Sequence, residues 1–345
     1  MNTDSHPRPP HLLVLRFSAL GDVAMTLPVI YSVAEAHSEV RITVVTRPFF
    51  SRLFINAPAN VSVEAIEPRD YRGITGRHRL LRKLSRLRPT AVADLHNVGR
   101  TWLIDSWMRL HGVRVVKVDK MRRSRGKVLG HDLVQPDFIH RYMSVFDKLG
   151  FSAPLTFRSL FADIPAQAPA PVGHPAVGVA PFARYENKMY PPEMMRRVVQ
   201  SLAERGVNVY LFGGRGHEAK EMEWWAREID GCHSVAGRFD LAGELAMMSK
   251  MELMISMDSA NQHLASLVDT PVLTLWGSTT PACGFTAYRQ PANLQMMSGI
   301  DCQPCTIAGS THCRRGDMAC MRRLSEDMIV GRVIDILGKE KKADV

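Results

Sequence analysis

An aspartate stands where the first apolar run of the chain gives way to a helical pattern. The segment RFSALGDVAMTLPV (16–29) follows the run HLLVL (11–15) and places Gly21 and Asp22 at the junction. A carboxylate at a helix start is stabilised by free backbone N–H groups and by the helix dipole. The same interactions keep it ionised, so Asp22 is either a helix cap or a group that takes a proton. Gly21 permits a tight turn or the close approach of another group.

Two loops in the second half of the chain also place charged and small residues after apolar runs. In APFARYENKMYPP (180–192), Arg184 and Lys188 are cations that either bind an anion or belong to an ordinary surface. In YLFGGRGHE (210–218), Gly213 and Gly214 would let a ligand approach the backbone. Glu218 then either accepts hydrogen bonds from a ribose or simply occupies the first turn of a helix.

A fourth loop, ISMDSANQH (255–263), combines a strand end with a helix start. Free backbone N–H groups at a helix start form a ready phosphate site. The residues that we assign to this predicted site are Asp258, Ser259, Ala260, Gln262 and His263.

Strand-like and helix-like runs alternate along the chain, which predicts an α/β protein with parallel sheets covered by helices on both faces. The strand-like runs are 11–17, 40–46, 61–66, 91–95, 113–118, 176–180, 207–212, 251–257 and 271–276, and helix-like runs include 23–37 and 77–87. A Pro-rich stretch around 162–176 interrupts the alternation and reads as a linker. Ligands of such sheets bind at the carboxyl ends of the strands, where the loops above begin.

The predicted organisation is therefore two doubly wound domains. Residues 1–165 form an acceptor-binding domain, 166–175 a linker and 176–323 a nucleotide-binding domain. Residues 324–345 form a terminal helix, which we consider able to pack back on the first domain, and a tail.

Charge and composition narrow the class of partner. The net charge of +10 favours an anionic partner. Basic residues cluster at 69–88 and 117–127, from which we select Arg77, Arg122 and Arg123 as candidate contacts. Tyr71 is the only aromatic residue in these clusters, which argues against stacking on nucleic acid. No run is long and apolar enough to span a bilayer, and the polar start lacks a signal-peptide pattern, so we predict a cytoplasmic protein.

Four of the six cysteines fall within one short segment, Cys302, Cys305, Cys313 and Cys320. Their spacing, C-x2-C-x7-C-x6-C, allows a structural Zn²⁺ site or a set of reduced, redox-labile thiols.

Taken in order, these loops resemble glycosyltransferase family 9, the lipopolysaccharide heptosyltransferases. The matching stretches are SALGDVAMTLP, NKMYP, LFGG and DSANQHLASLVDTPVLTLWGSTTP, which span about residues 12 to 322. The sequence departs from the family at Ala260–Asn261, where Gly-Pro or Gly-Leu is usual, and this leaves the preferred sugar nucleotide open.

The resemblance implies the GT-B fold, two Rossmann-like domains facing a central cleft. It also implies inverting transfer of heptose from ADP-heptose to the inner core and lipid A region of lipopolysaccharide, without a catalytic metal or other cofactor. Asp22 then corresponds to the general base, Lys188 to the phosphate-binding lysine and the loop from Asp258 to His263 to the diphosphate site. We expect Ser18, Gly21 and the selected arginines to bind the acceptor, and the protein to sit at the cytoplasmic face of the inner membrane.

Two alternatives remain. One is a GT-B transferase or epimerase that uses another nucleotide sugar. The other, more distant, is a non-enzymatic nucleic-acid-binding protein that relies on the basic clusters and a zinc knuckle.

Overall fold

The computed structural model describes residues 9–343. Residues 1–8 and 344–345, which include most of the polar start and the end of the predicted tail, lie outside the described residues. The chain divides into two compact units. The first runs up to Lys120 and adds Phe138–Phe157, and the second comprises Met121–Asp137 and the chain from Arg158 onward.

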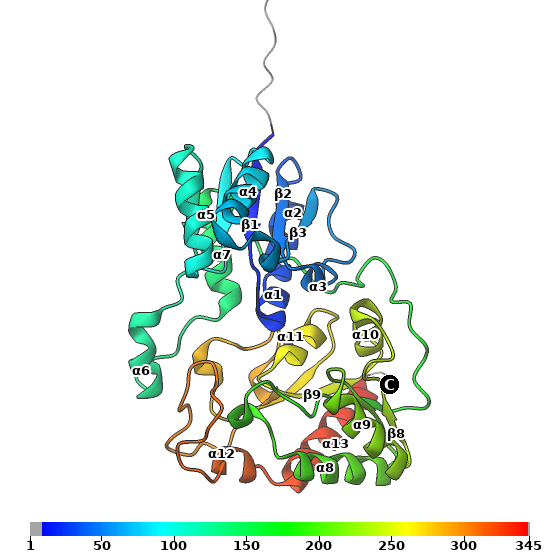
Figure 1. The fold of residues 1–345 in the computed structure, drawn as a ribbon. Helices are drawn as coiled ribbons and strands as arrows, with labels where there is room; N and C mark the ends of the chain where they lie inside the picture. Colours follow the sequence, from blue (N-terminus) through cyan, green and yellow to red (C-terminus); the bar gives the residue numbers. More distant parts are fainter. Residues whose placement is uncertain (1–8, 344–345) are drawn as a thin grey trace, which may run out of the picture. The chain divides into compact units, whose positions relative to one another are not determined.

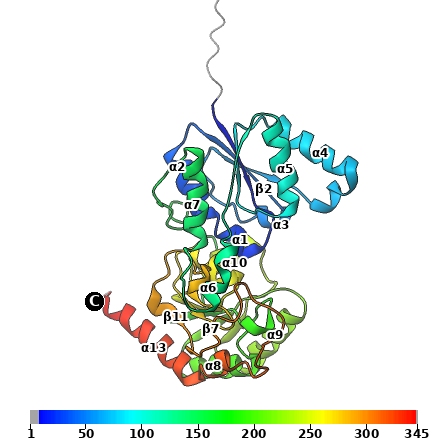
Figure 2. The same cartoon turned by 90° about the vertical axis from the view of Figure 1, so that its left-hand side faces the viewer.

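Unit 1 contains a five-stranded parallel sheet with strand order β3-β2-β1-β4-β5. Its strands are β1 (His11–Leu15), β2 (Arg41–Thr46), β3 (Val61–Ala65), β4 (Ala91–Asp94) and β5 (Arg114–Lys117). Its α-helices are α1 (Leu20–Ala24), α2 (Leu27–Ala36), α3 (Pro48–Ser51), α4 (Gly73–Arg86), α5 (Gly99–Leu110) and α7 (Phe138–Leu149). Helices α2 and α7 cover one face of the sheet and α4 and α5 the other, as Figure 2 shows.

The apolar residues of the first run explain why β1 lies in the middle of this sheet. Every residue of β1 is buried, as expected for a parallel strand with helices on both faces. Leu13 and Leu15 of β1 pack in one cluster with Leu80, Leu81 and Leu84 of α4. The three leucines form one buried stripe along the helix, at the spacing expected of an amphipathic helix.

Unit 2 contains a six-stranded parallel sheet with strand order β11-β10-β9-β6-β7-β8. Its strands are β6 (Ala176–Val179), β7 (Asn208–Leu211), β8 (Cys232–Ser234), β9 (Leu253–Met257), β10 (Val272–Leu275) and β11 (Gln295–Met296). Its α-helices are α6 (Arg125–Leu129), α8 (Pro192–Glu204), α9 (His217–Glu228), α10 (Leu241–Met248), α11 (Ala260–Ser266), α12 (Ala319–Arg322) and α13 (Glu326–Ala343). Helices α10 and α11 lie on one face and α8 and α13 on the other (Figure 1).

Both sheets confirm the predicted α/β class with doubly wound parallel sheets, and each expected strand is present within a few residues. Two short strands, β8 and β11, lack a recognisable apolar run and were not expected. The expected helix 23–37 is two helices, because the chain turns at Met25 and Thr26 between α1 and α2. The Thr26 hydroxyl donates to the Val23 carbonyl within this turn at 2.7 Å.

The terminal helix α13 packs on α8 in unit 2. Its buried residues Ile329, Val330 and Val333 join the core cluster that contains Val198 and Leu202 of α8. Helix α13 therefore belongs to the core of unit 2. No helix among the described residues is long and apolar enough to cross a membrane.

Candidate functional site

The strand order of each sheet identifies where a ligand should bind. In unit 1 the chain winds outward in opposite directions from β1 and β4, and in unit 2 from β6 and β9. A crevice forms beyond the carboxyl ends of two such strands, and ligands of open α/β sheets bind there. Asp22 follows β1, and Lys188 and Asp258 follow β6 and β9. The sequence-predicted residues thus fall at the two positions that topology favours.

Asp22 in unit 1 is held by two contacts. Arg16, which is 4% exposed, pairs with Oδ1 at 2.6 Å, and the Ala19 N–H donates to Oδ2 at 2.9 Å. Burial alone would lower the pKa of Arg16, but the charge and hydrogen bond of Asp22, together with Tyr142 and Asp94, outweigh burial and raise it. The contact with Ala19 caps α1, so the capping interpretation of Asp22 is correct. The side chain is also 26% exposed, so the same carboxylate remains accessible to a substrate hydroxyl.

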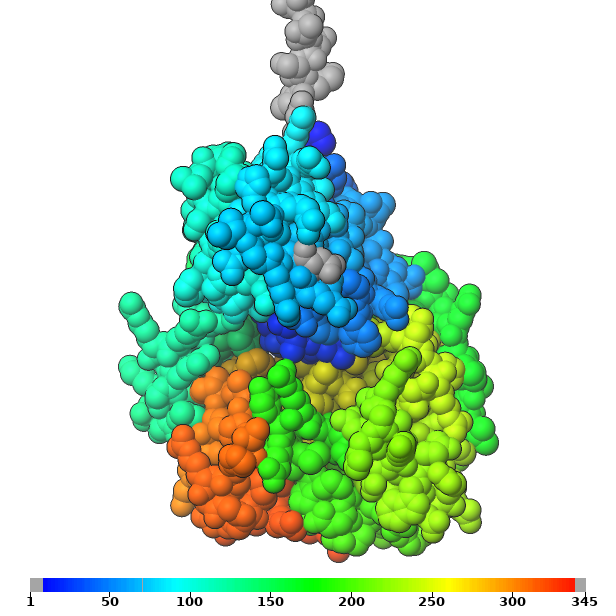
Figure 3. All heavy atoms as spheres, viewed as in Figure 1, coloured from blue at the N-terminus to red at the C-terminus, as the bar shows by residue number. Residues whose placement is uncertain are grey.

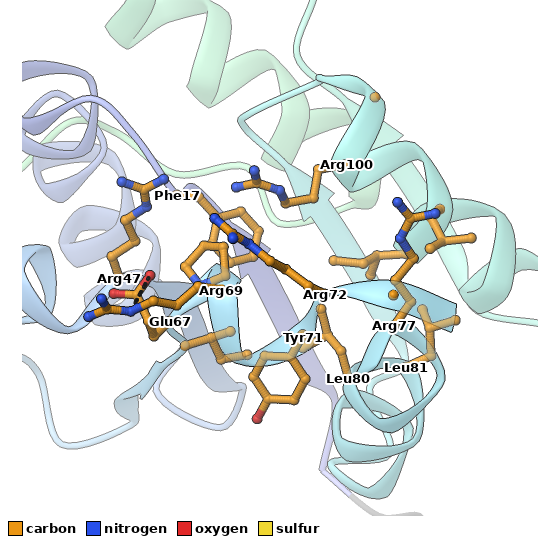
Figure 4. A pocket seen from close by; sticks show the side chains of 16 residues that line it. Phe17, Arg47, Glu67, Arg69, Tyr71, Arg72, Arg77, Leu80, Leu81 and Arg100 are labelled. Atoms are coloured by element: carbon orange, nitrogen blue, oxygen red, sulfur yellow. Dashed lines mark ion pairs between the residues drawn. The ribbon is translucent and has the colours of Figure 1, made fainter. Parts of the chain in front are cut away.

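A cavity of about 860 Å³ opens in unit 1, at the carboxyl edge of the sheet. Its most prominent feature is a set of arginines that come from the loops after β2 and β3 and from helices α4 and α5, namely Arg47, Arg69, Arg72, Arg77 and Arg100. Figure 4 shows their guanidinium groups around the cavity, with Arg69 paired to Glu67 at 3.8 Å. Among the described residues that line the cavity, Glu67 is the only acidic one against five arginines, so this lining is cationic and suits an anionic ligand.

The predicted acceptor residues divide between the units. Ser18, Gly21 and Arg77 lie in unit 1, and Arg77 lines the arginine cavity. Arg122 and Arg123, which the sequence grouped with the same basic face, belong to unit 2 because Met121–Asp137 packs with that unit. The backbone N–H of Gln135 donates to the Ala282 carbonyl at 2.9 Å and helps to tie the segment there.

Lys188 and Asp258 form a buried ion pair in unit 2. Lys188 Nζ lies 2.5 Å from Asp258 Oδ2, and the two side chains are 9% and 4% exposed. The Thr279 hydroxyl donates to the same oxygen at 2.6 Å, and Gln262 donates to Oδ1 at 3.0 Å. The lysine is thereby fixed beside the start of α11, where a phosphate would meet both its charge and backbone N–H groups.

The remaining residues of this loop have different surroundings. Gln262 is fully buried and also contacts the Phe285 carbonyl and Thr274, so it positions Asp258 from within the core. Ser259 and Ala260 are half-buried at the start of α11. His263 is buried on the same helix.

The glycine loop after β7 is occupied by the side chains of its own helix. The Gly214 N–H donates to Glu218 Oε2 at 2.7 Å, and a Cβ at Gly214 would lie 2.9 Å from that oxygen. A Cβ at Gly213 would lie 2.5 Å from Met222 Cε. The close approach that these glycines permit is therefore made by protein side chains, rather than by the ligand expected from the sequence. Arg184 is exposed and lies over the Tyr185 ring at 5.5 Å.

The cysteine-bearing segment packs beside Lys188. Asn187 and Ser310 exchange hydrogen bonds of 2.7 and 2.9 Å, and a Cβ at Gly309 would lie 2.8 Å from Lys188 Cδ. Figure 3 shows the orange surface of this segment against the green surface near residue 187.

The four thiols in this segment do not form a metal site. All are free, and Cys302, Cys305 and Cys313 line a small cavity of about 170 Å³. Burial raises the pKa of Cys305, and raises that of Cys320 to about 11. No three His, Cys, Asp or Glu side chains within residues 9–343 are arranged to hold a metal ion. The structure therefore does not support the zinc interpretation.

Sequence reasoning missed Arg47 and Arg100 of the cavity, as well as Arg16 and His96 near Asp22. Arg47 directly follows β2, and His96 and Arg100 lie shortly after β4. The rule that ligands meet the carboxyl ends of strands, applied to every strand of the first half, would have selected these three residues.

Comparisons with known proteins agree with this geometry. The sequence profile of glycosyltransferase family 9 (heptosyltransferase) matches residues 128–312. Lipopolysaccharide heptosyltransferase 1 of Pseudomonas aeruginosa is 23% identical over 306 residues, which are 85% of each chain.

Two solved structures show the same fold. A family 9 glycosyltransferase from Veillonella parvula superposes with a TM-score of 0.71 at 15% identity, covering 96% of this chain and 98% of that one. The Escherichia coli heptosyltransferase WaaC with ADP gives a TM-score of 0.66 at 18% identity, covering 94% and 99%. The fold is thus that of the GT-B heptosyltransferases.

Proposed function

Because the chain belongs to glycosyltransferase family 9, we propose that this glycosyltransferase moves a heptose from ADP-heptose to an anionic glycolipid, the inner-core and lipid A region of lipopolysaccharide. The observation that carries the acceptor side of the proposal is the arginine cavity at the carboxyl edge of the unit 1 sheet. Four of its five arginines, all except Arg69, have no ion pair with any described carboxylate, so their charge is available to phosphate or carboxylate groups of the acceptor.

Asp22 is the proposed general base. The acceptor hydroxyl loses its proton to the Asp22 carboxylate as its oxygen bonds to the anomeric carbon of the donor. The bond between that carbon and the diphosphate breaks on the opposite face, so the anomeric configuration inverts. Arg16 and the Ala19 N–H fix the direction of the carboxylate, and its partial exposure lets the hydroxyl approach.

Lys188 is the proposed partner of the diphosphate. The leaving ADP gains negative charge in the transition state, and a fixed ammonium beside a helix start stabilises that charge. Asp258 holds Lys188 in place before the donor arrives. The contacts with Thr279 and Gln262 keep Asp258 in position while Lys188 also contacts the phosphate.

The proposed site of action is the cytoplasmic face of the inner membrane. Helix α4 buries its leucine stripe and exposes Arg77, Arg79, Arg82 and Arg86, while Ile74 at its start is 86% exposed. A basic helix face with an apolar residue at one end suits an anionic bilayer surface, at which such an acceptor would be embedded.

The first test is calorimetric titration of the wild type and Lys188→Ala with ADP, UDP and GDP, with Lys250→Ala as an exposed-lysine control. We expect ADP to bind most tightly, with affinity lost in Lys188→Ala and kept in Lys250→Ala. Preference for UDP or GDP would replace the donor with another nucleotide sugar, which is the alternative function. Absence of nucleotide binding would contradict the transferase assignment. Product NMR of the anomeric centre then tests inversion.

A further inference from the structure

Ser18 and His96 meet beside the β1–β4 crevice of unit 1. Ser18 lies between β1 and α1, and His96 follows β4. His96 Nε2 lies 3.3 Å from Ser18 Oγ, and the ring is 7% exposed. The backbone N–H of His96 donates to Asp94 Oδ1 at 2.9 Å. The ring lies 6.0 Å from that of Phe17, measured between centroids, so both backbone and ring are held in place.

The imidazole of His96 is neutral near pH 7. Burial, together with the charges of Arg16 and Lys120, lowers its pKa to about 3. A neutral ring carries one N–H and one nitrogen without a proton. The contacts of the two nitrogens decide which of them carries the proton. Nδ1 is buried and has no hydrogen-bond partner among the described residues.

The proton belongs on Nε2. A buried N–H without a hydrogen-bond partner is rarer in proteins than a buried acceptor without one. Placing the proton on Nε2 lets it donate to Ser18 Oγ and leaves the bare nitrogen at the buried position. Ser18 then accepts a hydrogen bond from His96, and its own O–H must point elsewhere.

Ser18 directly precedes the residue that contacts the Asp22 carboxylate. This next residue, Ala19, donates its N–H to Asp22 Oδ2 at 2.9 Å. Ser18 is half-buried, and within residues 9–343 its Oγ has no hydrogen bond other than that with His96. A half-buried serine whose oxygen already accepts a hydrogen bond can donate its O–H to a substrate oxygen.

We propose that His96 is a positioning residue, which turns the Ser18 hydroxyl so that it donates to an oxygen of the acceptor sugar beside the hydroxyl that Asp22 deprotonates. The inference rests on the proposed function and adds how the acceptor is oriented at the base. Orientation of this kind contributes to rate because the attacking oxygen must be held close to its target and aligned with it. Ser18 touches the substrate, and His96 acts through Ser18.

The kinetic test compares His96→Leu, His96→Gln, Ser18→Ala and the double variant His96→Leu/Ser18→Ala. Leucine removes the donor, and glutamine places an amide N–H near the position of Nε2. We expect kcat/KM for the acceptor to fall about 3- to 10-fold in His96→Leu and in Ser18→Ala, as for one hydrogen bond. The double variant should fall no further, His96→Gln should stay within about twofold of wild type, and ADP affinity should not change.

Two kinetic outcomes would overturn the proposal. If the losses in the double variant multiply, the two residues act independently. If His96→Gln is as impaired as His96→Leu while its thermal unfolding matches wild type, the imidazole is not acting as a donor to Ser18.

A second measurement does not depend on activity. Nitrogen-15 NMR of the full chain, with His96 assigned by its loss in His96→Gln, should show a neutral ring with the proton on Nε2 from pH 5 to 8. A proton on Nδ1, or titration in that range, would refute the pair. Wild-type protein that transfers no sugar but shows this tautomer would contradict the proposed function and leave the Ser18–His96 geometry intact.

Discussion

Each unit of the molecule carries a cation paired with a carboxylate where its sheet changes direction, but the two pairs face their surroundings differently. In unit 1 the cation, Arg16, is buried and the carboxylate of Asp22 is 26% exposed. In unit 2 both Lys188 and Asp258 are almost fully buried, and two further side chains hold Asp258. Unit 1 thus has a partly exposed carboxylate that a ligand can contact, whereas unit 2 holds a lysine in a fixed position. The difference matches a proton acceptor in one unit and a phosphate-binding group in the other.

The sharpest test of the unit 1 pair is Asp22→Asn. The amide oxygen can still accept from the Ala19 N–H, but the side chain no longer takes a proton. We expect kcat to fall about 10²- to 10⁴-fold, the usual contribution of a general base. Calorimetry should show unchanged ADP binding, because the proposed nucleotide site lies in unit 2. A variant that retains more than a tenth of wild-type kcat would remove Asp22 from the chemistry.

The unit 2 pair is tested by Lys188→Ala. Removing the lysine side chain leaves Asp258 buried without a counter-charge, so the free energy of unfolding should fall by about 3 kcal/mol. ADP affinity should fall about 10- to 100-fold, because a hydrogen bond from a charged group is lost. The double variant Lys188→Met/Asp258→Asn separates the two effects. It should regain stability in chemical denaturation while ADP affinity stays low, and recovery of affinity would show that the lysine is structural.

The arginine cavity belongs to the comparison of the two units, because it lies in unit 1, which also carries the partly exposed Asp22 carboxylate. Arg72→Ala and Arg100→Ala should each raise KM for the acceptor about 10-fold, as expected when one charged hydrogen bond is lost. Arg52→Ala, at an exposed position after α3 and outside the cavity lining, is the control. Steady-state kinetics at two salt concentrations measures the effect. Equal changes in all three variants would indicate general surface charge instead of a binding cavity.

A smaller effect concerns Asp105 of helix α5 in unit 1. Its Oδ2 lies 2.9 Å from Lys117 Nζ. Burial, reinforced by the nearby Asp94, raises the pKa of Asp105 well above its usual range. The folded state therefore binds this proton more tightly than the unfolded state, and its contribution to stability is lost as pH rises from about 4 toward neutral. Asp105→Asn should flatten the slope of unfolding free energy against pH by at most about 1.4 kcal/mol per pH unit. An unchanged slope in urea titrations from pH 4 to 8 would contradict the assignment.

The regular part of the fold was predictable from the sequence because parallel strands in doubly wound sheets are continuous apolar runs. Strand β1 is buried along its whole length, and its sequence, HLLVL, contains almost nothing else. Strands β8 and β11 were not predictable in the same way. They lie at the edge of the sheet, where two or three residues suffice and sheet pairing, rather than hydrophobicity, decides the conformation.

The candidate site was predictable where one loop carries its own chemistry, as for Asp22, Lys188 and Asp258. It was not predictable where side chains from distant segments form the site together. The arginine cavity gathers residues from two loops and two helices, and no local pattern shows that Arg47 and Arg100 share it. Gly213 and Gly214 show the converse limit, because a glycine pair indicates a close approach but does not say whether a ligand or a neighbouring side chain makes it.

Different segments of unit 1 support Asp22 and the arginine cavity, and this affects how such enzymes diverge. Asp22 depends on Arg16 and on the start of α1, whereas the arginines of the cavity come from the loops after β2 and β3 and from α4 and α5. Substitutions and insertions in those loops can alter which anionic groups are recognised without disturbing the support of the base. Acceptor preference is therefore free to evolve separately from the chemical step, and lineages that decorate different glycolipids can retain one catalytic element.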